Sequence, residues 1–108
     1  MDVRLQTPVP LFSLTRVMRS KNAGPLCLTI DLFFHDRAGF DRATGSVALS
    51  AQAVSALYGL RPDQVVRHDW PEILAIKLSM PRKHCAGDPG DSDVYGAQQH
   101  APLLGVRV

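Results

Sequence analysis

Residues 26–34 form the most apolar run of the chain, and within it Leu28, Ile30 and Leu32 recur at every second position. A period of two is the pattern of a β-strand that buries one of its faces. Because this run is also the longest of its kind, we expect it to lie in the centre of a sheet, with Ile30 and Leu32 in the core.

Two helices are predicted from capping residues and helix breakers. Ser13 is a candidate N-cap for a short helix over residues 14–18, which would stop at the Asn-Ala-Gly-Pro breaker that follows. Ser50 and Gly59 are the expected caps of a second helix, which fills the residues between them. The face of this helix that should pack on the sheet comprises Ala53, Val54, Leu57 and Tyr58.

The order of the predicted elements indicates the fold class. Residues 1–12 should form a flexible arm ahead of a single domain over residues 13–108, because Pro8 and Pro10 oppose regular structure. The elements follow the order β-α-β-β-α-β, the plan of a ferredoxin-like α+β sandwich with a mainly antiparallel sheet. The remaining predicted elements are strands over residues 65–69, 73–80 and 103–108, a helix-prone segment from residue 35 and a short helical turn over residues 95–100.

Composition excludes several functional classes. The 108 residues are 45% hydrophobic, which fits one compact domain with a modest core. Twelve basic and ten acidic residues leave a net charge of +2, and only 6% of residues are aromatic, so nucleic-acid binding is not predicted. No apolar run approaches the length of a membrane span, and Cys27 and Cys85 show neither metal-type spacing nor a disulfide framework. We expect a cytoplasmic protein with no membrane segment.

Residues 19–24 combine a guanidinium, an ammonium and a turn that glycine permits. Arg19 and Lys21 are able to donate to a carboxylate or phosphate, and backbone N–H groups near Asn22 would complete an anion cradle. The same residues also suit the C-terminus of a helix, where basic side chains complement the helix dipole and Asn-Ala-Gly ends the helix. The spacing is not that of a P-loop.

Residues 87–102 form the most polar stretch of the chain. Asp88, Asp91 and Asp93 suit a Ca²⁺ or Mg²⁺ ion, a plain turn, or ion pairs with the basic residues of segment 19–24 across one end of the sheet. The EF-hand spacing is absent, so we predict no metal site, and the sequence shows no cofactor motif, which leaves the cofactor unknown. The candidates for proton transfer are Asp91, Asp93 and His100, and those for substrate binding are Arg19, Lys21, Asn22, Tyr95 and Gln99.

A family resemblance rests on two stretches, Arg-Ser-Lys-Asn-Ala-Gly-Pro at 19–25 and the polar stretch extended to residues 87–104. The chain resembles a bacterial family of small domains of unknown function associated with the acyclic terpene utilisation protein AtuA, over about residues 13–108. Members occur beside an AtuA-like large protein, or a related ferredoxin-fold domain is fused to it. The resemblance implies an accessory subunit of that partner in the catabolism of carboxylic acids or acyl thioesters.

Three functions therefore stand open at the level of sequence. The first is an accessory subunit or interaction domain of an AtuA-like large subunit, whose two polar segments complete a composite site for a small carboxylate- or phosphate-bearing ligand. The second is a small stand-alone lyase or hydratase acting on a carboxylic acid. The third is a structural module that forms a homo-oligomer through exposed apolar surface or an open sheet edge.

Overall fold

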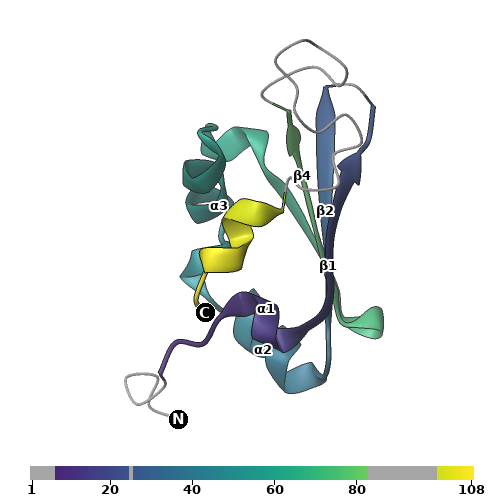
Figure 1. The fold of residues 1–108 in the computed structure, drawn as a ribbon, viewed down its shortest axis with the longest axis vertical. Helices are drawn as coiled ribbons and strands as arrows, with labels where there is room; N and C mark the ends of the chain where they lie inside the picture. Colours follow the sequence, from purple (N-terminus) through teal and green to yellow (C-terminus); the bar gives the residue numbers. More distant parts are fainter. Residues whose placement is uncertain (1–6, 25, 83–99) are drawn as a thin grey trace.

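The computed structural model describes residues 7–24, 26–82 and 100–108, which form one antiparallel sheet with helices on one side (Figure 1). Four strands lie in the order β1-β2-β4-β3, so β2 is an inner strand as its apolar pattern predicts. The mixed α+β class with an antiparallel sheet is confirmed, and it is compatible with a small ferredoxin-like fold. The strands are β1 (Thr15–Asn22), β2 (Cys27–Phe34), β3 (Val66–Trp70) and β4 (Ala75–Pro81).

The helical layer follows β2 in the chain. Asp36 caps the first of its helices by accepting a hydrogen bond from the backbone N–H of Gly39, at 2.8 Å. Ser50 caps the second in the same way, and Gly59 ends it in the left-handed conformation that glycine adopts without strain. Single helical turns connect the other elements. The helical segments are α1 (Leu11–Leu14), α2 (Arg37–Thr44), η2 (Val47–Leu49), α3 (Ala51–Tyr58), η3 (Pro62–Gln64), η4 (Pro71–Ile73) and η5 (Ala101–Gly105).

The core lies between the sheet and the helices. Alternate residues of β2 and β4 point into it, and Ile30 and Leu32 are fully buried, as predicted. On α3, Val54 is fully buried, but Leu57 is 44% exposed, so the predicted packing face of this helix is wrong at that residue. The larger core residues are Leu11, Leu28, Ile30, Leu32, Phe34, Phe40, Leu49, Val54, Ile76, Leu78, Met80 and Leu103.

The predicted helix over residues 14–18 is wrong, because α1 ends at Leu14 and residues 15–18 begin β1. Ser13 lies inside the single turn of α1, and its hydroxyl donates back to the carbonyl of Pro10 at 2.7 Å instead of capping a helix. From Thr15 onward the chain is extended and pairs with β2. The apolar face of β2 supplies a partner for every second residue of β1, and this tertiary pairing outweighs the local helical signal.

The predicted last strand over residues 103–108 is wrong for most of its length. Pro102 suits the start of a helical turn, and η5 inserts Leu103 fully into the core. Only Arg107 forms a β-bridge, with Pro10. Two backbone hydrogen bonds, of 2.9 and 2.8 Å, join Val9 and Val108 on one side of this bridge, and the N–H of Leu11 donates to the carbonyl of Val106 at 2.8 Å on the other. Residues 9–11 therefore contact residues 106–108 through the backbone.

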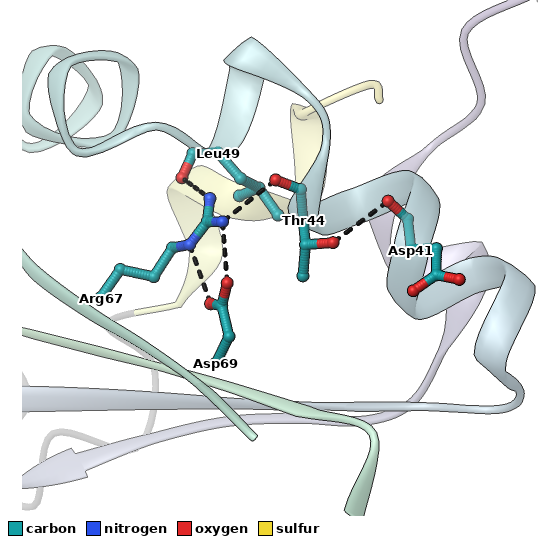
Figure 2. Close-up of polar contacts among 5 residues, drawn as sticks. All are labelled: Asp41, Thr44, Leu49, Arg67 and Asp69. Carbon is teal, nitrogen blue, oxygen red and sulfur yellow. Dashed lines mark hydrogen bonds and ion pairs between the residues drawn. The ribbon is translucent and has the colours of Figure 1, made fainter. Parts of the chain in front are cut away.

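Arg67 of β3 joins the sheet to the helical layer (Figure 2). Its guanidinium donates to the carbonyl of Leu49 at 2.9 Å, to the carbonyl of Thr44 at 3.0 Å and to both carboxylate oxygens of Asp69. Asp69 lies two residues away on the same strand, and both side chains are partly buried. One planar fork thus satisfies the carbonyls that end α2 and η2.

Burial gives one residue of the helical layer a pH-dependent effect on stability. Tyr58 packs against the core, and burial raises the pKa of its phenol well above the ordinary 10.0. As the pH rises above about 10, the phenol ionises in the unfolded chain before it ionises in the folded one. The free energy of unfolding should therefore fall with rising pH, beginning near that pH.

Urea unfolding at about pH 8 and about pH 11 tests this expectation. Replacing Tyr58 by phenylalanine should reduce the loss of stability between these two pH values, whatever the variant does to stability at the lower one. An equal loss in both proteins would show that Tyr58 does not contribute to alkaline destabilisation.

Candidate functional site

The alternation of β1 divides the basic segment 19–22 between the two faces of the sheet. Ser20 pairs with Ile30 and Asn22 with Leu28, and both of these partners are buried on the helical side. Arg19 and Lys21 pair with Asp31 and Thr29, whose side chains lie on the opposite side. The three residues predicted to form one anion cradle therefore do not share a face.

Ser20 contacts His100, which precedes η5. The Ser20 hydroxyl lies 3.2 Å from Nδ1 of the imidazole, and it accepts the backbone N–H of His100 at 3.2 Å. Ser20 is buried and the imidazole is partly exposed. The contact holds the ring by one nitrogen, which leaves Nε2 as the nitrogen able to take part in proton transfer.

Asn22 contacts Arg82, the residue after β4. An Nη of Arg82 donates to Oδ1 of Asn22 at 2.5 Å, and the arginine is only 8% exposed. A buried guanidinium with fixed orientation is a strong donor to a carboxylate or phosphate. We call Ser20, Asn22, Arg82 and His100 the polar cluster; it combines an imidazole with a guanidinium near one end of the sheet.

The residues on the opposite side define a second surface. Arg19 lies 3.6 Å from the carboxylate of Asp31, with 60% of its own side chain exposed. The neighbouring strands extend this surface. We call this side of the sheet the open face. On β1 it consists of Val17, Arg19 and Lys21, together with the guanidinium of Arg16. On the other strands it consists of residues 27, 29, 31 and 33 of β2, residues 66, 68 and 70 of β3, and residues 75, 77, 79 and 81 of β4.

Four of the predicted site residues, Asp91, Asp93, Tyr95 and Gln99, lie outside the described residues. The predicted ion pairs between the basic segment and the aspartates of residues 88–93 therefore stay predictions. Among the described residues, His100 is the member of the polar stretch that reaches β1, through Ser20.

Sequence reasoning missed Ser20 and Arg82 as site residues. Neither has a chemical partner nearby in the chain, because 80 positions separate Ser20 from His100 and 60 separate Arg82 from Asn22. Their positions are the signal that could have identified them. Ser20 is a polar residue at a strand position whose side chain points toward the core, and Arg82 directly follows a strand.

The described part of the chain contains neither a group of metal ligands nor a helix that could span a membrane. Residues 7–24, 26–82 and 100–108 contain no group of three or more His, Cys, Asp or Glu side chains that would hold a metal ion. Within the same ranges, no helix has both the length and the apolar character that crossing a membrane requires.

The fold and the polar cluster define a small two-layer α+β domain with polar residues gathered near one end of its sheet. Residues 11–107 match the family described as a domain of unknown function, DUF4387. The chain belongs to this family. No curated protein and no solved structure gives a significant match.

Proposed function

We propose that this chain is an accessory subunit of an AtuA-like large protein and that the two act together on a carboxylic acid or an acyl thioester. In this proposal the polar cluster contributes to a composite site with the large subunit. Arg82 and Asn22 bind a carboxylate or phosphate of the substrate, and His100 moves a proton.

The observation that carries the proposal is the contact between Ser20 and His100. It joins the two polar segments that the sequence singles out, although they are far apart in the chain. The cluster supplies an imidazole as a base and a guanidinium as an anion-binding group. Such a set of groups suits a site that a second protein completes.

The proposal predicts the behaviour of the purified proteins. The chain alone should show no turnover of acyl thioesters or hydroxy acids, and it should co-purify with the AtuA-like large protein when the two are expressed together. Robust turnover by the isolated chain, or no association with the large protein, would contradict the accessory role.

Within the complex, His100→Gln should lower the rate about 10²-fold, the lower end of what a positioned acid–base group contributes. The amide still accepts or donates a hydrogen bond, so assembly should be unchanged. His35→Gln is the matched control, because His35 is exposed in the loop between β2 and α2 and should leave the rate unchanged. Equal rates for the two variants would exclude His100 from the chemistry.

A further inference from the structure

One side of the sheet has no α-helix over it in the part of the chain that the structure describes, and only the single turn η4 projects toward that side at one end of the sheet (Figure 1). Helices α2 and α3 and the turn η5 all lie on the other side. An antiparallel sheet tolerates one solvated face when that face is polar. The open face defined above is polar only in part.

Its side chains fall into rows across the four strands. One row is apolar and consists of Val17, Phe33, Ala75 and Trp70. The next row is charged and consists of Arg19, Asp31, Lys77 and His68. The open face thus places an apolar strip directly beside a charged one.

The charge of this surface is mostly of one sign. Arg16, Arg19, Lys21 and Lys77 are its cations, and Asp31 is its single carboxylate, so the formal charge is +3 with His68 neutral. The whole chain carries only +2, which means that the open face is more basic than the rest of the molecule.

Each aromatic ring of the open face already has a cation or an imidazole beside it, although Trp70 is still 41% exposed. The guanidiniums of Arg16 and Arg19 lie over the ring of Phe33, at 5.2 and 5.4 Å from its centroid. The ammonium of Lys77 lies 5.7 Å from the Trp70 ring, and His68 stacks on that ring. Single-stranded nucleic acids bind by stacking bases on free ring faces, so this arrangement favours a protein over a nucleic acid.

An apolar hollow adjoins the charged rows. It has a volume of about 310 Å³, and four of its lining residues, Cys27, Val66, Ser79 and Pro81, belong to the open face. The others are Leu26, Gln64 and Met80. Leu26 is 63% exposed and Val66 51% exposed, so the hollow has room for an apolar side chain from outside the domain.

We infer that the open face is the surface that binds the large subunit, and that it recognises an acidic protein surface with an apolar side chain that fills the hollow. This inference rests on the proposed function, since it names the docking surface for the same partner, which would reach the polar cluster around the end of the sheet where Asn22 ends β1 and Arg82 follows β4. Carboxylates of that partner face Arg16, Arg19, Lys21 and Lys77. A second copy of this chain fits less well, because face-to-face pairing would bring two surfaces of charge +3 together.

The test measures binding of the AtuA-like large protein to the wild-type chain and to a double variant, Arg16→Glu with Lys77→Gln. Three units of positive charge are lost from the open face, and the dissociation constant should rise at least about tenfold. Raising the salt concentration should weaken wild-type binding more than variant binding. The matched control, Arg37→Glu with Arg61→Gln, removes the same charge from outside the sheet and should bind within about twofold of wild type.

Four results separate the hypotheses. Wild-type binding that the double variant preserves would overturn the docking surface and leave the accessory function intact. No wild-type binding would overturn both. A dimer of the isolated chain, or binding of a single-stranded 20-nucleotide DNA, that the double variant abolishes would assign the face to another occupant. If the double variant does not fold by circular dichroism, Arg16→Gln on the exposed bulge of β1 replaces it, with the same expected direction.

Discussion

Replacing Leu78 by alanine will lower the free energy of unfolding by about 2–5 kcal/mol, the range for removing a fully buried leucine side chain. Leu78 lies on β4, pairs with Ile30 of β2 and Arg67 of β3, and has no exposed surface. The cavity would open where the inner strands meet the helical layer, and surrounding strands have little freedom to close it. Urea unfolding followed by circular dichroism measures the change.

Leu57→Ala is the matched control for this variant. Leu57 belongs to α3 but is 44% exposed, and alanine is the better helix former. The cost should stay below about 1 kcal/mol. A large loss at Leu57 and a small one at Leu78 would mean that α3 packs on the sheet as its sequence pattern predicts and not as the structure has it.

Replacing Arg67 by alanine should cost about 3 kcal/mol of stability. The substitution removes the donor from two backbone carbonyls, those of Thr44 and Leu49, and leaves the partly buried Asp69 without its ion-pair partner (Figure 2). Arg67→Lys should recover only part of the loss, because an ammonium does not reproduce the planar fork that reaches three groups at once.

Arg61 provides a close comparison, since it also pairs with an aspartate two residues later. The Arg61–Asp63 pair is 3.1 Å long, but its side chains are 72% and 73% exposed. Arg61→Ala should change the free energy of unfolding by less than about 1 kcal/mol. Similar losses at Arg61 and Arg67 would show that the buried carbonyl contacts contribute little.

Elements with a strong local signal were predictable from the sequence. The alternation in residues 26–34 correctly placed β2 inside the sheet, and Ser50 and Gly59 bounded α3 as capping residues do. In each case the residues that determine the element lie within or next to it.

Elements whose conformation depends on distant partners were predicted wrongly. Residues 15–18 join the sheet because their backbone pairs with that of β2. Leu103 enters the core from a helical turn because its side chain fills space between the sheet and the helices. The geometry of the candidate site could not be predicted from the sequence for the same reason. The pairing of Ser20 with His100 and the separation of Arg19 from Asn22 both follow from β1 being a strand.

The contacts between Val9 and Val108 have a consequence for how the protein is made. Leu11 is fully buried and its N–H donates to the carbonyl of Val106, so one of the first core residues to leave the ribosome requires some of the last to be ordered. The two hairpins pair locally and can form on the nascent chain. The helical layer can complete its packing around Leu11 only after residue 106 has left the ribosome. Almost the whole domain must therefore be synthesised before its core excludes water.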